Sequence, residues 1–240
     1  AFLVAAGAAV AAALLSLAVP TRVMPVTAGA PAPVRRAHRL IHPAALGPGL
    51  VLAAGIGGFA VFAAFLPDHA RAVGLSGSGG LFAAYSVVCL VLRLTGARLP
   101  ERLGARRSVT IALSSTGAAL ALLAAVPQPW ALWTAAALVG TGQAFLYPSL
   151  MATTVNRVDD HERAVALGSF TMFFDIGTMV GGLALGAVAD VFGKRAAFGG
   201  GVFLAMAGLW LLWTRVAPVV TETRRPAIAA SPVYVPVAGD

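Results

Sequence analysis

The chain has 240 residues, of which 59% are hydrophobic and only 11% are charged, and its formal net charge is +8. Soluble domains carry about 25% charged residues, so an ordinary soluble core of this length is excluded and lipid must cover the apolar surface. The basic residues lie in short loops between apolar stretches, where they report membrane topology. The lipid bilayer is therefore the expected partner, and nucleic acid is not.

Seven apolar stretches are long enough to cross a hydrocarbon layer roughly 30 Å thick, or nearly so. The sequence therefore predicts an all-α membrane protein, a polytopic helical bundle with seven transmembrane helices. The predicted spans are, in chain order, Ala1–Val19, Leu50–Leu66, Leu81–Leu92, Val109–Val126, Ala131–Leu150, Ala164–Val188 and Ala196–Trp213.

The segments between the spans divide the chain into four parts. Residues 1–19 form a lone first span, and residues 20–48 are rich in proline, alanine and arginine, which predicts a cytoplasmic linker. Six spans follow over residues 49–215. Residues 216–240 contain repeated prolines and are predicted to be a disordered cytoplasmic tail. Before the sixth span, Asp159 or Asp160 is expected to cap the helix start.

Basic residues are distributed unevenly between the two ends of the spans. Most of the 17 fall after the first, third and fifth spans and in the tail, whereas the opposite side holds Arg71, Lys194 and Arg195. The positive-inside rule places the C-terminus in the cytoplasm and Ala1 outside, in a multi-pass protein of the cell inner (plasma) membrane. Because the chain starts outside and without Met, we expect a fragment of a longer protein. Arg93, at a span end, is expected to extend to the cytoplasmic surface.

The sixth span contains an acid, Asp175, within an apolar helix. A charged Asp at the bilayer centre costs about 2.5–3.5 kcal/mol on insertion scales. Such a group persists by facing a water-filled cavity, by pairing or by staying protonated. Asp175 is therefore a candidate proton-coupling or cavity-lining residue, and a structural hydrogen bond to a neighbouring helix is the alternative. Gln143, Tyr147 and Tyr85 are further candidates for lining a cavity.

Glycines recur on the same span at four-residue spacing. Small residues at this spacing let helix backbones approach closely in lipid. Gly168, Asp175, Thr178, Gly182 and Gly186 are expected to share one face. The residues predicted to serve helix packing are Gly177, Gly181, Gly182 and Gly186.

The loop after the third span, from Arg93 to Arg107, holds the most specific local signal. Gly96 can end the preceding helix, and Gly104 permits a sharp turn. Glu101 is the one acid in the loop. It is expected to pair with a neighbouring arginine or to face the start of another helix, and an incidental acid in a positive-inside loop is the alternative.

This loop resembles the signature between the second and third helices of each half of major facilitator superfamily transporters, roughly G-x-L-A-D-R-x-G-R-R. The pattern matches at Leu99, Arg102, Gly104, Arg106 and Arg107. It departs with Ala97 for the first Gly, Pro100 for Ala, Glu101 for Asp and Ala105 for Arg. Gly140–Ala152 and Glu162–Gly193 are similar to the tenth and eleventh helices of bacterial efflux-type members.

The resemblance implies the C-terminal six-helix half of this fold, preceded by the last helix of the N-terminal half. The implied function is secondary active transport of a small solute by alternating access, with proton-coupled efflux as the expected mode. The four packing glycines would also take part in gating, and the missing N-terminal half of the same transporter would be a partner. A conformational latch would involve Gly96, Leu99, Glu101, Arg102, Gly104, Arg106 and Arg107.

Other membrane functions fit the residues less well. A seven-helix receptor or sensor without retinal is the alternative, because the one lysine, Lys194, lies in a loop and a retinal Schiff base needs an intrahelical lysine. Neither a zinc-protease motif nor a phosphate-binding loop occurs, so we expect neither an enzyme nor ATP hydrolysis. The four histidines lack metal-ligand spacing, so neither a metal nor a cofactor is expected.

Overall fold

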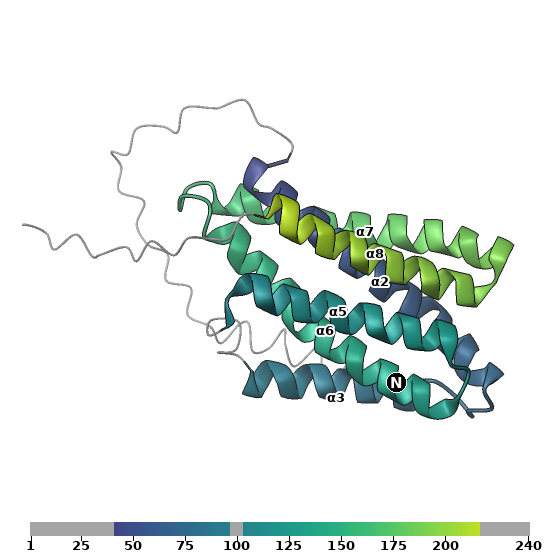
Figure 1. The fold of residues 1–240 in the computed structure, drawn as a ribbon. Helices are drawn as coiled ribbons and strands as arrows, with labels where there is room; N and C mark the ends of the chain where they lie inside the picture. Colours follow the sequence, from purple (N-terminus) through teal and green to yellow (C-terminus); the bar gives the residue numbers. More distant parts are fainter. Residues whose placement is uncertain (1–40, 97–102, 217–240) are drawn as a thin grey trace, which may run out of the picture. The chain divides into compact units, whose positions relative to one another are not determined.

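The computed structural model describes residues 41–96 and 103–216, and these ranges contain six α-helices. The six predicted spans from Leu50 onward each fall on one of these helices, as Figure 1 shows, so the prediction of an all-helical protein is confirmed. The first predicted span, most of the predicted linker and the predicted tail lie outside the described residues. The helices are α2 (Pro43–Ala72), α3 (Gly79–Thr95), α5 (Ala105–Ala125), α6 (Pro129–Val155), α7 (Arg163–Phe192) and α8 (Lys194–Arg215).

The helices differ in how well their length and composition suit a membrane. Among the described residues, four helices are long and apolar enough to cross one, namely α2, α5, α7 and α8. The apolar helix α3 is shorter, with 17 residues. The helix α6 has 27 residues but does not join the four, because polar residues such as Gln143 and Tyr147 dilute its apolar character.

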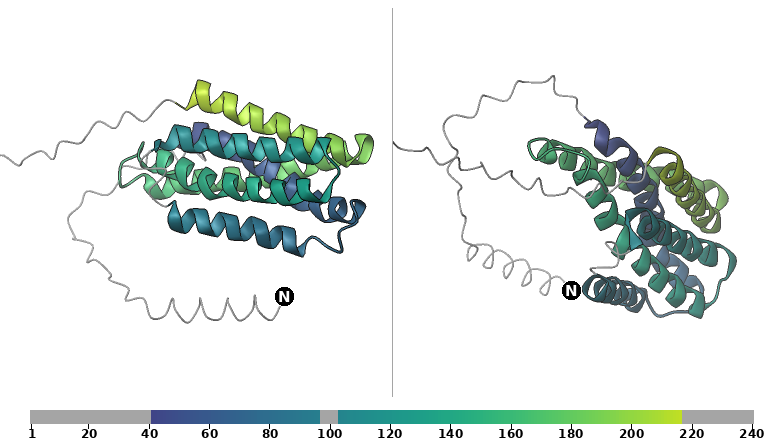
Figure 2. Two further views of the ribbon diagram at one scale, coloured as in Figure 1. Left: turned by 60° about the horizontal axis from the view of Figure 1, so that its bottom comes forward. Right: turned by 60° about the vertical axis from the view of Figure 1, so that its left-hand side comes forward.

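The bundle is organised around α2. This helix packs along α7 and α8, α5 packs along α6 and α8, and α3 lies against α6 (Figures 1 and 2). One apolar cluster contains Phe62 and Phe198, and a second contains Leu52 and Phe170. The side of α7 that faces away from α2 is left open by the described helices.

Local signals explain where several helices begin. The helix α2 starts at Pro43, inside the predicted linker, because proline suits the first helical position and the Nδ1 atom of His42 accepts a hydrogen bond from the Ala44 amide at 3.2 Å. The prediction that an aspartate caps the sixth span is wrong. The residue at the cap position of α7 is Glu162, and Asp160 instead pairs with Arg163, the first residue of the helix, at 2.9 Å.

All four tryptophans of the chain are exposed and lie near helix ends. Trp130 and Trp133 occupy the first turns of α6, whereas Trp210 and Trp213 occupy the last turns of α8. These two helix ends lie at opposite ends of the bundle (Figure 1). Exposed tryptophans at both ends match the aromatic belts of membrane proteins, where indole rings sit at the headgroup level.

Candidate functional site

One face of α7 packs closely against α2. A Cβ atom placed on Gly177 would lie 2.6 Å from the Ala53 Cα, and one placed on Gly181 would lie 2.4 Å from the Gly57 Cα. Real Cβ atoms essentially never approach another heavy atom within 3.0 Å. These two glycines therefore let the backbones of α2 and α7 come together.

The other face of α7 is open. A Cβ on Gly168, Gly182 or Gly186 would meet nothing within 4 Å, and Asp175 and Thr178 are exposed. These five residues lie on the open face, as their spacing predicts. The pair Gly182 and Gly186 does not pack against any helix of the described residues, which separates it from the pair that contacts α2. The gating role of all four glycines stays a prediction.

The Asp175 carboxylate stands on this open face. Its neighbour Phe174 is also exposed, at 38%. Within residues 41–96 and 103–216, no hydrogen bond or ion pair joins Asp175 to another residue. The described helices therefore supply neither a salt-bridge partner nor the structural hydrogen bond considered as the alternative.

Two of the other candidate lining residues lie on α6. The Tyr147 ring lies 5.4 Å from the Phe170 ring and 6.4 Å from the Phe174 ring, measured between centroids. Tyr147 of α6 thus contacts α7 at Phe174, the residue that precedes Asp175. Gln143, one turn earlier, is buried, and its Nε2 atom has no hydrogen-bond partner among the described residues. An unpaired buried amide donor costs free energy, so Gln143 stays a candidate lining residue.

Tyr85 and Arg93 both lie on α3. The Tyr85 ring packs 5.6 Å from the Phe59 ring of α2, away from the α6 and α7 residues just described. The Arg93 residue is exposed, and its Nη2 atom donates to the Gln143 carbonyl at 3.4 Å, so its extension to the cytoplasmic surface stays a prediction. Helical side chains tilt toward the helix N-terminus, which directs this guanidinium back along α3.

The predicted latch is only partly described. Leu99, Glu101 and Arg102 lie outside the described residues. Gly96 ends α3, and its amide donates to the Leu92 carbonyl at 2.8 Å. Gly104 precedes α5 with φ +79°, a conformation that glycine adopts readily.

The last two residues of the predicted latch, Arg106 and Arg107, lie in the first turn of α5. The Arg106 Nη2 atom donates to the Trp213 carbonyl at 2.9 Å, and its guanidinium carbon lies 4.1 Å from the Trp213 ring centroid. Arg107 is exposed. The motif therefore joins the start of α5 to the end of α8.

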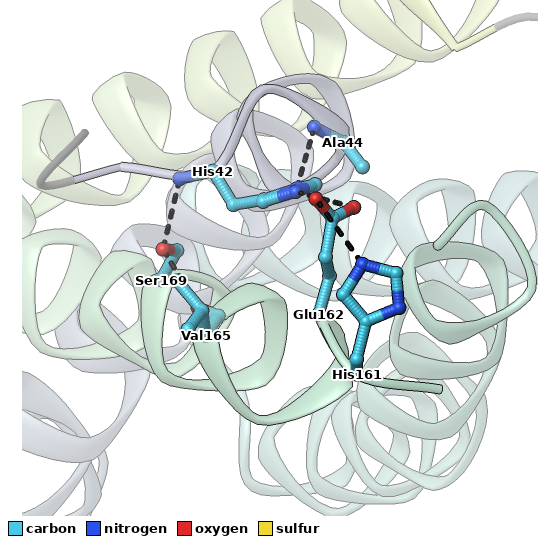
Figure 3. A network of polar contacts seen from close by, with 6 residues as sticks. All are labelled: His42, Ala44, His161, Glu162, Val165 and Ser169. Carbon is cyan, nitrogen blue, oxygen red and sulfur yellow. Dashed lines mark hydrogen bonds and ion pairs between the residues drawn. The ribbon is translucent and has the colours of Figure 1, made fainter. Parts of the chain in front are cut away.

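Figure 3 shows a polar cluster that joins the start of α2 to the start of α7. The His42 amide donates to the Ser169 Oγ atom at 2.9 Å, and the Ser169 hydroxyl donates to the Val165 carbonyl. The His42 Nε2 atom lies 3.4 Å from a Glu162 carboxylate oxygen. His161 approaches the other oxygen of Glu162 at 4.0 Å.

The opposite end of the bundle has its own ionic link. The Lys194 Nζ atom, at the start of α8, lies 2.8 Å from a carboxylate oxygen of Asp68 near the end of α2. Arg71 pairs with the other oxygen of Asp68. Neither this link nor the His42 cluster is evident from sequence spacing, because each joins residues more than a hundred positions apart.

Comparison with known proteins identifies the family. Residues 49–237 match the sequence model of the Major Facilitator Superfamily. The chain belongs to this superfamily. It is 32% identical over 200 residues to an uncharacterized MFS-type transporter of Pseudomonas aeruginosa strain PAO1, covering 82% of this chain and 49% of that protein. It spans about half the length of this and the other first curated relatives that it matches.

More distant members of the superfamily also match. The chain is 27% identical over 197 residues to the uncharacterized MFS-type transporter YhhS of Escherichia coli K12, covering 80% of this chain and 45% of that protein. It is 26% identical over 135 residues to the multidrug resistance protein MdtH of Yersinia enterocolitica, covering 56% of this chain and 34% of that protein. The superfamily is one of multi-pass membrane transporters rather than enzymes, and the match favours a transporter over a receptor.

Proposed function

We propose that the six described helices form the C-terminal half of a major facilitator transporter and that residues 1–19 supply the last helix of its N-terminal half. The complete protein then has a small-molecule solute as its substrate and moves it by alternating access, as its two halves rock about a site near the bilayer midplane. The family match from residue 49 and the succession of six helices support this assignment. All seven predicted spans cross the inner membrane in this proposal.

The charges at the two ends of the bundle support a cytoplasmic C-terminus. Arg106, Arg107 and Arg215 lie at one end. Arg157 lies in the loop between α6 and α7 at the same end, where desolvation by burial lowers the pKa of its guanidinium. Arginine stays protonated at neutral pH despite such a shift. Basic residues at this end outnumber Arg71, Lys194 and Arg195 at the other end, as the positive-inside rule expects of a cytoplasmic end. The latch loop lies on this side in the proposal.

The open face of α7 carries the proposed mechanism. An unpaired carboxylate on an otherwise apolar helix is costly against acyl chains, so the face that bears Asp175 is better matched by a polar path than by lipid. Asp175 then binds a proton or a cationic solute on this path. Tyr147 and Gln143 line it from α6. Proton-coupled efflux is the mode we propose, with the printed name of MdtH as modest support.

Substitution of Asp175 tests the proposal. Asparagine matches aspartate in shape but neither binds a proton nor carries charge. We expect Asp175→Asn, expressed from the complete reading frame, to lower pH-gradient-driven transport of ethidium in everted vesicles by about 10-fold or more. Asp190→Asn is the matched control, because Asp190 is an exposed acid in the last turn of the same helix. Equal rates in both variants, or wild-type vesicles without gradient-driven ethidium flux, would contradict the proposed coupling.

A further inference from the structure

A separate basic surface lies where α5 begins beside the end of α8. We propose that Arg106, Arg107 and Arg215, together with Trp213, bind the headgroup of an anionic phospholipid. This inference goes beyond the transport function and does not depend on Asp175. It rests on unbalanced positive charge, on an arginine with an unpaired donor, and on the depth in the membrane that the exposed tryptophans indicate.

Among the described residues, the basic start of α5 lacks the carboxylate partner that two similar helix starts have. A helix start carries partial positive charge, so a basic residue there is unfavourable without a nearby anion. The first residue of α7 pairs with Asp160 at 2.9 Å, and Lys194, the first residue of α8, pairs with Asp68 at 2.8 Å. By contrast, no carboxylate among the described residues pairs with Arg106 or Arg107.

Arg106 is held in place and keeps unused hydrogen-bond donors. Its guanidinium stacks on the Trp213 ring and gives one hydrogen bond to the Trp213 carbonyl. The Nε atom is buried and has no partner in the described part of the chain. An arginine has five N–H donors arranged in a planar fork that suits a phosphate, so the Nη groups of Arg106 can donate to an anion at this surface, where the described residues supply no carboxylate.

The tryptophans place this surface at the level of lipid headgroups. Trp210 and Trp213 are 62% and 59% exposed in the last turns of α8, and exposed tryptophans mark the membrane interface. Arg107 and Arg215 are exposed beside them. Basic residues at this level, next to an indole ring, complement the phosphate and net negative charge of an anionic phospholipid.

Lipid binding to the purified 240-residue chain tests the inference. Native mass spectrometry in detergent would compare phosphatidylglycerol with phosphatidylcholine of the same acyl chains. We expect the wild-type chain to prefer phosphatidylglycerol, and R106Q/R107Q to weaken its binding by about 30-fold, since each basic residue near the surface contributes roughly a factor of five. R107Q alone, which removes no contact between described residues, should weaken binding by about 5-fold.

The control R71Q/R195Q removes the same charge at the opposite end of the bundle. It should leave phosphatidylglycerol binding within about 2-fold of wild type, because charges more than a Debye length away are screened. Circular dichroism verifies that each variant keeps its helical content. Equal loss in both double variants, equal binding of the two lipids to the wild-type chain, or complete displacement of phosphatidylglycerol by excess inorganic phosphate would overturn the inference.

Discussion

Replacing Gly181 with alanine tests how closely α2 and α7 must approach. The new Cβ atom would lie 2.4 Å from the Gly57 Cα and 3.2 Å from the Gly57 carbonyl carbon, whereas ordinary contact begins at 3.4 Å. Both neighbours are backbone atoms, so no side-chain rotation relieves the overlap. The two helices must therefore separate locally by about 1 Å, and interiors as dense as those of organic crystals resist such a shift.

The cost of this separation follows from two opposing effects. Overpacking typically costs about 1–3 kcal/mol, and alanine regains up to about 1 kcal/mol of helix propensity over glycine. We expect the free energy of unfolding to fall by about 1–2 kcal/mol, which lowers Tm by roughly 2–8 °C for a chain of this size. Gly177→Ala should act in the same direction. The double variant should cost less than the sum, because one separation relieves both overlaps.

Thermal unfolding of the purified 240-residue chain in detergent, followed by circular dichroism, measures these effects. Gly182→Ala is the matched control, because it makes the same change on the same helix where nothing lies within 4 Å, and its Tm should stay unchanged or rise slightly. Gly57→Ala should be intermediate, since the nearest atom to its Cβ is the flexible Leu204 Cδ1 at 2.9 Å. Equal Tm values for the Gly181 and Gly182 variants would refute the close approach of α2 and α7.

Two further predictions concern the helix cap and the tryptophans. His42→Ala should lower Tm by about 3 °C, because it removes the Nδ1 atom that accepts from the Ala44 amide; His42→Asn should recover most of the loss, and matching melting curves for the two variants would argue against the cap. In bilayers, tryptophan fluorescence should be quenched more by lipids brominated near the headgroup than by lipids brominated near the chain ends, because all four indoles lie near helix ends. Stronger quenching from the chain ends would show that these helices sit at another depth.

The positions of the helices could be predicted from the sequence because bilayer thickness and turn residues limit where a helix can begin and end. The predicted span Val109–Val126 corresponds to α5 at Ala105–Ala125. The helix α2 extends further than its predicted span, since it continues through Pro48 and Pro67. Packing against α7 and α8 compensates for the backbone hydrogen bonds that these prolines remove.

The contact partners of individual side chains were harder to predict from the sequence. Glycines at four-residue spacing occur twice on α7, and only the fold decides that Gly177 and Gly181, rather than Gly182 and Gly186, meet α2. The bond between His42 and Ser169 joins residues 127 positions apart, so no local pattern indicates it. The tryptophans near the ends of α6 and α8 are a further signal of the membrane interface that is present in the sequence.

Thiol accessibility at position 175 tests the central claim most directly, namely that the open face of α7 borders a water-filled path. The chain has one cysteine, Cys89, so Asp175→Cys in a Cys89→Ser background carries a unique thiol. In membranes that contain the product of the complete reading frame, we predict that a membrane-impermeant maleimide labels this thiol. Phe203→Cys is the comparison, because Phe203 is 71% exposed on the apolar helix α8, and we expect it to stay unlabelled. A cysteine at position 175 as unreactive as the one at position 203 would place Asp175 against lipid and contradict the account.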